Sequence, residues 1–289
     1  MSSIHNNRRE ALKGMALGTV GLVATGTNLS AKTAAGWSLA KNELKGKVAI
    51  VTGARANLGK GFAIALAEAG ADVVVHHHLP PTQDQAEETA KLCQKHGAKT
   101  AIAVGDLGQA DNVKKLFDIA ENQLGGVDIV VHSAGAIEKA PIAEITDEQF
   151  ERVMNINFRG TFLVLREAAK RIRDEGRIIN ISSSITAGQT PNYGVYAGSK
   201  AGLEQMAMAL SNELGPRRIT VNNVAPGPLD NSFFHGEENP QSVEYATNMA
   251  PLKRLGKEDD IVPVVAMLAT SQALWLNGQT IYVNNGYAS

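Results

Sequence analysis

Seven short apolar runs, separated by stretches of helical periodicity, constrain the fold of this chain more than any other feature. The predicted strands are residues 47–52, 71–76, 100–104, 126–132, 177–182, 218–224 and 279–284. Helices are predicted at residues 62–69, 83–96, 111–123, 146–173 and 259–270, with a further one from residue 196. Short buried strands that alternate with helices predict an α/β fold, a doubly wound seven-stranded parallel sheet with helices on both faces.

Two of these helices carry start signals. Asp111 is expected to be the N-cap of the helix at 111–123. Thr146-Asp-Glu-Gln has the pattern of a capping box, and the helix after it is predicted to run to about residue 173. Inside that helix lies Asn157, followed closely by Gly160, and both are unfavourable there by propensity. Such a local conflict often marks a functional site, although a packing kink would also explain it.

The composition indicates one soluble domain with a tail. The 289 residues are 44% hydrophobic and 20% charged, with a net charge of −1, which gives no support for a nucleic-acid partner. Cys93 is the single cysteine, so no disulfide within the chain and no thiolate metal site is expected. Residues 76–78 are consecutive histidines that would point to alternate faces, so no metal site is predicted there either.

Residues 1–40 differ from the rest of the chain. Arg8 and Arg9 precede an uncharged run at 14–30, and small residues follow. We interpret this segment as an export signal of the twin-arginine type with its linker, and we expect a periplasmic protein. A tail on a cytoplasmic protein is the alternative. The apolar run is too short for a stable membrane span. The catalytic domain is predicted to comprise residues 45–289.

A glycine turn joins the first predicted strand to the first helix. The turn runs from Gly53 to Gly59, and Arg55, Asn57 and Leu58 lie within it. Such a turn lets the backbone approach a pyrophosphate, which the N–H groups at the helix N-terminus can bind. The position between a strand and a helix strengthens an otherwise weak glycine pattern.

The second strand ends in His76, where an NAD site would usually carry an acidic residue. With no carboxylate to repel it, a 2′-phosphate could bind there, and Arg55 could pair with it. The sequence therefore favours NADP(H) over NAD(H). Asp106 and Leu107 follow the third strand and could contact the adenine.

Tyr196 and Lys200 are four residues apart on one face of a predicted helix, and Ser183 lies at the end of the preceding strand. A lysine cation one turn away is expected to lower the pKa of the phenol, and the serine hydroxyl could hold a substrate carbonyl beside it. The spacing by itself is common on helix faces that have no catalytic role. The other features of the chain favour the catalytic interpretation.

Together these residues resemble the short-chain dehydrogenase/reductase family over residues 45–289, in a single-domain Rossmann fold. The resemblance rests on the glycine turn, Asp106, Ala134-Gly135, Asn157, Ser183, Tyr196-x-x-x-Lys200 and Pro226-Gly227. It implies a catalytic tetrad of Asn157, Ser183, Tyr196 and Lys200. It also implies cofactor contacts from Ala134, Gly135, Tyr196, Lys200, Pro226, Gly227 and Asn231, with Ser232 as an alternative to Asn231.

This sequence departs from the family pattern at four places: Asn57 replaces a glycine, His132-Ser133 replaces two asparagines, Asn231 replaces a threonine, and Asn284-Asn285-Gly286 replaces Asp-Gly-Gly. Asn57 can still adopt a left-handed conformation. All four tetrad residues remain.

The resemblance implies hydride transfer between NADP(H) and a ketone or secondary alcohol, with Tyr196 as general acid/base, and is closest to 3-oxoacyl-carrier-protein reductases. The loop at 136–145 and a long, irregular, polar lid at 228–256 would shape the site for a small-molecule substrate. The family is commonly tetrameric, so a homo-oligomer is expected. The alternative is an NAD(P)-binding sensor or scaffold without turnover. Epimerases of the extended type share Tyr-x-x-x-Lys but need a larger C-terminal domain.

Overall fold

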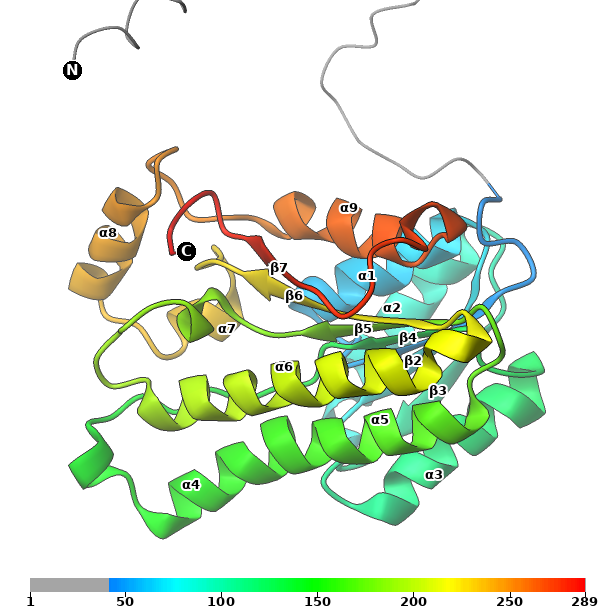
Figure 1. Cartoon of the computed structure of the whole chain (residues 1–289), viewed down its shortest axis with the longest axis horizontal. Helices are drawn as coiled ribbons and strands as arrows, with labels where there is room; N and C mark the ends of the chain where they lie inside the picture. Colours follow the sequence, from blue (N-terminus) through cyan, green and yellow to red (C-terminus); the bar gives the residue numbers. More distant parts are fainter. Residues whose placement is uncertain (1–41, 289) are drawn as a thin grey trace, which may run out of the picture. The chain divides into compact units, whose positions relative to one another are not determined.

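The computed structural model describes residues 42–288; the predicted export signal at 1–40 lies outside them. Seven parallel strands form one sheet in the order β3-β2-β1-β4-β5-β6-β7, with helices on both faces (Figure 1). Residues 42–288 thus form a single Rossmann-like domain, which confirms the predicted fold class. The strands are β1 Val48–Thr52, β2 Asp72–His77, β3 Thr100–Val104, β4 Ile129–His132, β5 Arg177–Ile181, β6 Thr220–Pro226 and β7 Thr280–Val283.

Side chains that alternate along the strands belong to two separate hydrophobic clusters, one on each face of the sheet. Ala49 and Val51 of β1 pack with α1 (Asn57–Glu68), α2 (Gln83–Gln94) and α9 (Glu258–Leu268). Val48 and Ile50 of the same strand pack on the other face with α3 (Ala110–Ile119), α5 (Gly160–Arg171) and α6 (Gly194–Leu214). Because successive strand residues point to opposite faces, both faces of an apolar run must be covered, and the helix layers cover them.

The structure corrects three expectations about helices. Helix α3 starts one residue before Asp111, with Gln109 at the N-cap, and after Ile119 it continues as a π-helix at Ala120–Leu124. Asp111 therefore lies in the first turn, where its carboxylate favours the positive end of the helix dipole. The capping box at Thr146 is confirmed, but the helix after it is not continuous. A π-helix at Met154–Arg159 separates α4 (Asp147–Val153) from α5.

The lid is not irregular. It contains α7 (Ser232–His235) and α8 (Pro240–Met249), which begin at the asparagine N-caps Asn231 and Asn239. In both helices the asparagine side chain accepts a backbone N–H, and α8 adds a proline at its first position. Both features are ordinary helix start signals. The prediction of an irregular lid rested on the length and polar composition of the segment and did not take them into account.

A chain of hydrogen bonds crosses the centre of the sheet through His132. The Thr52 hydroxyl oxygen accepts the N–H groups of Ser133 and Ala134, so its own proton faces Nδ1 of His132 at 2.9 Å. Nε2 then carries the ring proton and donates to the Thr161 hydroxyl at 3.0 Å. Thr161 in turn donates to the main-chain oxygen of Asn157 at 2.5 Å. Each donor has an acceptor only if His132 is neutral.

Two buried histidines therefore make the fold sensitive to acid. Burial lowers the pKa of His132 to about 3 and that of His76 to about 4. The unfolded chain binds these protons near pH 6.5 and the folded chain does not, so stability is lost as the pH falls below 6.5.

We expect the free energy of unfolding to fall by up to about 2.7 kcal/mol per pH unit between pH 6 and pH 4 from these two groups alone. Urea unfolding at a series of pH values measures this slope. In His132→Asn, which removes one titrating group, the slope should fall by about 1.4 kcal/mol per pH unit. An unchanged slope would contradict the assignment of a neutral His132.

Candidate active site

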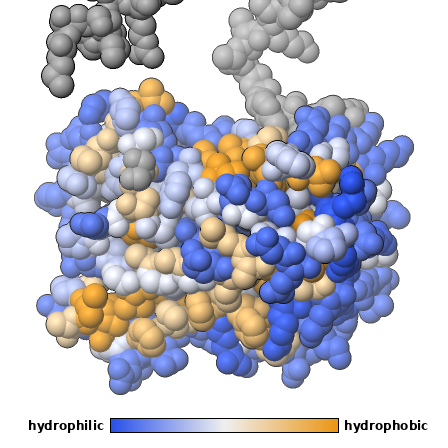
Figure 2. All heavy atoms as spheres, viewed as in Figure 1, coloured by the Kyte–Doolittle hydropathy of each residue, from blue (hydrophilic) through white to orange (hydrophobic). Residues whose placement is uncertain are grey.

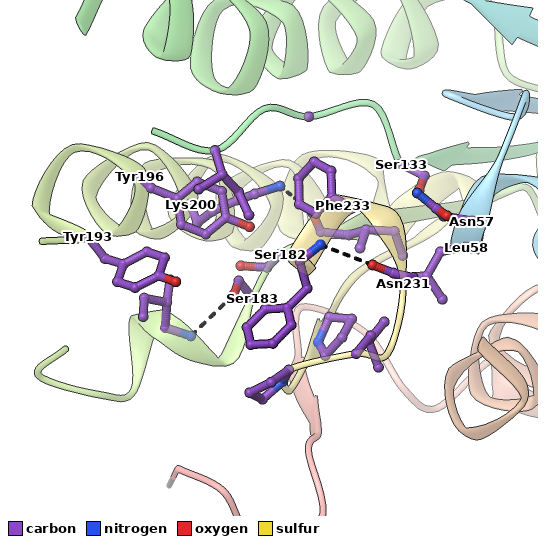
Figure 3. A pocket seen from close by; sticks show the side chains of 18 of the residues that line it. Asn57, Leu58, Ser133, Ser182, Ser183, Tyr193, Tyr196, Lys200, Asn231 and Phe233 are labelled. Carbon is purple, nitrogen blue, oxygen red and sulfur yellow. Dashed lines mark hydrogen bonds between the residues drawn. The ribbon is translucent and has the colours of Figure 1, made fainter. Parts of the chain in front are cut away.

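One cavity of about 790 Å³ lies where the strands end at their carboxyl termini. It is lined by the glycine turn after β1, by residues that follow β2 to β6, and by the lid (Figure 3). In an open parallel sheet this edge is the usual place for a ligand. The cavity brings together sixteen of the seventeen predicted site residues at this edge, all except Asn157: Gly53, Arg55, Asn57, Leu58, Gly59, His76, Asp106, Leu107, Ala134, Gly135, Ser183, Tyr196, Lys200, Pro226, Gly227 and Asn231.

The glycine turn has the backbone that a phosphate cradle needs. Gly53 and Asn57 have φ values of 65° and 48°, so Asn57 adopts the left-handed conformation expected of it. Leu58 and Gly59 follow in the first turn of α1. A Cβ atom at Gly59 would lie 2.3 Å from the carbonyl oxygen of Gly53, which leaves room for a hydrogen atom only. The turn therefore fits the pyrophosphate of a dinucleotide.

The side chains at the predicted adenosine end differ in how accessible they are to a ligand. Arg55 is exposed and donates to Gln85 of α2. His76 lines the cavity but is only 2% exposed, and both ring nitrogens are engaged, with the N–H of Gly53 at 3.3 Å and the oxygen of Gly105 at 2.9 Å. His76 thus supports the turn from behind, and Arg55 is the better candidate for a 2′-phosphate.

Asp106 and Leu107 follow β3 and line the same end of the cavity. One carboxylate oxygen of Asp106 accepts the N–H of Gly108 at 2.9 Å, and the other faces Asn155 at 3.5 Å. Leu107 is buried. Asp106 therefore also shapes its own turn, which holds the loop in place beside the adenosine end.

Ser183, Tyr196 and Lys200 meet at the other end of the cavity (Figure 3). The Ser183 side chain lies close enough to the Tyr196 phenol to lower its pKa. Lys200 lies one helical turn after Tyr196, and its Nζ donates to the main-chain oxygen of Ile181 at 2.8 Å. Figure 3 shows the Ser183 and Tyr196 hydroxyls turned toward the same open space. A carbonyl oxygen placed there could accept from both.

Asn157 lies in the π-helix at Met154–Arg159, and it is buried behind this cluster and does not line the cavity. Its side-chain amide donates to the oxygen of Ala136 at 2.8 Å and to Ser199 at 3.0 Å, and its oxygen accepts the N–H of Ala136 at 2.8 Å. Asn157 thus ties the loop after β4 to α6. A Cβ at Gly135 would lie 3.3 Å from the Asn157 side-chain oxygen and 3.4 Å from Nζ of Lys200, so the backbone passes close beside both.

Burial dominates the pKa values of the cluster. It raises the pKa of the Tyr196 phenol to about 12, and the neighbouring Ser183 hydroxyl offsets this only in part. It also lowers the pKa of Lys200 to about 8, while Glu204 acts in the opposite direction. The sequence predicted that Lys200 would lower the pKa of Tyr196, and the net direction found here is the reverse. Loss of solvation disfavours the phenolate more strongly than its neighbours favour it.

Pro226 ends β6, and Gly227 passes against β7: a Cβ there would lie 3.0 Å from the Cα of Asn284. Both ends of the Asn231 side chain are occupied, since its amide donates to Glu258 and its oxygen caps α7. The Ser232 hydroxyl exchanges hydrogen bonds with the Asn57 side chain at 3.1 and 3.2 Å. The lid is therefore attached directly to the glycine turn.

Two polar groups of the site were not foreseen. Glu238 of the lid accepts from Lys139 and from the Tyr193 hydroxyl, which connects three loops around the cavity. Glu204, two turns after Tyr196, accepts from Ser182 and Thr186. The helical spacing of Tyr196, Lys200 and Glu204 could have indicated Glu204. No local pattern indicates Glu238, because its partners lie 99 and 45 residues away.

Within residues 42–288, no cluster of three or more His, Cys, Asp or Glu side chains is arranged to hold a metal ion. No helix in this part of the chain is both long and apolar enough to span a membrane.

The fold and the cavity define a Rossmann-type oxidoreductase site, and comparison with known proteins assigns the family. The family model described as enoyl-(acyl carrier protein) reductase matches residues 53–288. A short-chain type dehydrogenase/reductase of Picea abies is 41% identical over 253 residues, which cover 84% of this chain and 93% of that protein. The chain belongs to the short-chain dehydrogenase/reductase family, and it is an enzyme of that class.

The names of two further similar proteins mention a cofactor. The chloroplastic NADPH-dependent aldehyde reductase 2 of Arabidopsis thaliana is 38% identical over 258 residues, covering 84% of this chain and 94% of that protein. The crystal structure of the angucycline C-6 ketoreductase LanV with bound NADP matches with a TM-score of 0.80 at 35% identity, covering 87% of this chain and 99% of that one.

The close approach at Gly59 leads to a test of the cradle. In Gly59→Ala, the added carbon would displace the Gly53 carbonyl, so we expect loss of dinucleotide binding together with reduced stability. Gly198→Ala is the matched control, because no atom lies within 4 Å of a Cβ at this position in α6. It should keep binding and gain about 0.5–1 kcal/mol. Titration of NADPH fluorescence measures binding, and urea unfolding measures stability. Normal NADPH binding by Gly59→Ala would contradict the assignment of the glycine turn as the pyrophosphate site.

Proposed function

We propose that this enzyme transfers a hydride between NADP(H) and a ketone or secondary alcohol, with Tyr196 as the general acid/base. The observation that carries the proposal is the meeting of Tyr196, Ser183 and Lys200 in the same cavity as the glycine turn. The names of two relatives, an NADPH-dependent aldehyde reductase and a ketoreductase solved with NADP, support the same reaction.

Each residue of the site has a separate role in carbonyl reduction. The glycine turn and Arg55 would hold the dinucleotide, which supplies the hydride when bound. The Ser183 hydroxyl orients the carbonyl oxygen. Tyr196 is protonated at neutral pH, since its pKa is raised to about 12, and it can therefore give its proton to the developing alkoxide.

Lys200 stabilises the phenolate that remains after this transfer. Its Nζ lies 5.8 Å from the centre of the Tyr196 ring, and the interaction with Glu204 favours its charged form. In a site closed to water, a fixed cation is worth more than it is in solution. Asn157 positions α6 against the loop after β4, and so it holds Tyr196 and Lys200 at the cavity.

Tyr196→Phe tests the mechanism, because it removes the transferable proton and keeps the ring. We expect kcat for ketone reduction to fall by about a thousandfold. NADPH affinity, measured by fluorescence titration, should change little. A variant that keeps full turnover would exclude Tyr196 as the acid. If the wild-type protein binds NADPH but reduces none of a broad set of carbonyl compounds, it is instead a sensor or scaffold.

We also propose a preference for NADP(H) over NAD(H). Its support is the exposed guanidinium of Arg55 beside the end of β2, where His76, His77 and His78 stand in place of a carboxylate. NADPH should bind more tightly than NADH. Arg55→Leu should weaken NADPH binding by about 10- to 100-fold and leave NADH binding unchanged, which serves as the internal control. Equal loss of both would contradict a 2′-phosphate contact.

We further propose that the enzyme is a homo-oligomer, with a tetramer as the expected form. Large apolar side chains gather on the outer surface of α4, the π-helix and α5, among them Phe150, Phe158 and Phe162, which are 42%, 36% and 45% exposed. Figure 2 shows apolar surface across the lower part of the view, where Figure 1 draws α5 and α6. Exposed apolar surface of this kind favours association.

Two finer assignments remain hypotheses. Export by the twin-arginine route depends on residues 1–40, which lie outside the described part of the chain. A 3-oxoacyl thioester is the substrate suggested by the resemblance of the sequence, and it can be compared directly with other carbonyl compounds.

A further inference from the structure

The half of the cavity where Ser183, Tyr196 and Lys200 meet, opposite the adenosine end, is the substrate half. It is rich in aromatic side chains. The chain has seven Phe, two Trp and five Tyr residues, and six of these line the cavity. They come from the segment before α6, from α6 itself, from both lid helices and from the C-terminal segment: Tyr193, Tyr196, Phe233, Phe234, Tyr245 and Tyr287. Because aromatic residues make up only 5% of the whole chain, their concentration around the cavity is a property of the site.

Two of these rings are available to a ligand. Phe233 is 39% exposed and Tyr245 is 60% exposed, although both line the cavity. In Figure 3, the rings of Phe233 and Tyr193 lie on either side of the Tyr196 hydroxyl. A flat ring system that presents its carbonyl to Tyr196 would cover apolar surface of both. Aromatic rings add favourable contact energy when they stack or meet edge to face.

The charges in this half of the cavity are already paired. Apart from Lys200, its charged lining residues within the described part of the chain are Lys139 and Glu238. These two form an ion pair, with side chains 18% and 2% exposed, and the Tyr193 hydroxyl donates to the same carboxylate. The Lys139 ammonium also lies 5.2 Å from the centre of the Tyr193 ring. Away from Lys200, a charged substrate would therefore have to break this pair before it gained a partner.

From these features we infer that the substrate is a neutral, flat, fused-ring aromatic ketone, held between the lid aromatics and Tyr193. This inference rests on the proposed ketone reduction and specifies its substrate class. Phe233 and Tyr245 are the specificity-determining residues. The Lys139–Glu238 pair holds the lid against the loop after β4 and keeps the ring site free of net charge.

Two ketones of nearly the same size separate an aromatic preference from a general preference for bulk. 2-Tetralone and 2-decalone are both neutral bicyclic ketones whose carbonyl is not conjugated with a ring, and only the first contains an aromatic ring. With NADPH, kcat/KM should be on the order of tenfold higher for 2-tetralone. Acetoacetyl-CoA, an anionic 3-oxoacyl thioester, should be the poorest of the three.

Leucine variants test the assigned residues. Phe233→Leu and Tyr245→Leu keep apolar bulk but remove the rings, so each should reduce the ratio of the two kcat/KM values toward one, mainly through KM for 2-tetralone. Tyr282→Leu is the matched control, since Tyr282 is 41% exposed but does not line the cavity. It should keep the wild-type ratio.

The outcomes distinguish the two levels of the proposal. If 2-decalone or acetoacetyl-CoA is reduced as efficiently as 2-tetralone, the aromatic inference fails while ketone reduction stands. A ratio that is unaffected by both leucine variants also overturns the inference. If NADPH binds but none of the three compounds is reduced, the proposed function itself fails.

Discussion

The site depends on a hydrogen-bond chain that requires a neutral histidine at the centre of the sheet. Thr52, His132 and Thr161 connect the end of β1 to the main-chain oxygen of Asn157, and every donor in the chain has one acceptor. Where the family usually has asparagine, His132 spans β1 and α5 with its two ring nitrogens. Because an imidazolium has no lone pair to accept from Thr52, protonation of His132 would break the chain at its first link.

Burial then determines the chemistry of the catalytic cluster. Tyr196 and Lys200 are 5% and 4% exposed, and removal from water favours the neutral form of each. Glu204 lies one turn beyond Lys200 and opposes this effect for the lysine, while Ser182 and Thr186 hold its carboxylate in place. The result is a protonated phenol beside a cation, an arrangement suited to proton donation during carbonyl reduction.

The lid is integrated with the rest of the site at both ends of the cavity. Ser232 bonds to Asn57 of the glycine turn, and Glu238 bonds to Lys139 and Tyr193 beside the catalytic residues. The same segment that carries Phe233 and Tyr245 is thus attached to both the proposed cofactor site and the proposed substrate site. Movement of the lid would change both sites together, which links substrate recognition to cofactor binding.

Sequence alone determined the order of strands and helices, the glycine turn and the positions of Asn157, Ser183, Tyr196 and Lys200. The elements and the glycine turn follow from local periodicity and spacing, which are properties of neighbouring residues, whereas the four tetrad residues as a set were implied by the family resemblance. Only the tertiary structure decided which side chains meet: Asn57 and Ser232 are 175 residues apart, and Lys139 and Glu238 are 99 apart. It also decided the direction of the Tyr196 pKa shift and the engagement of His76, because desolvation and hydrogen bonding depend on how the elements pack.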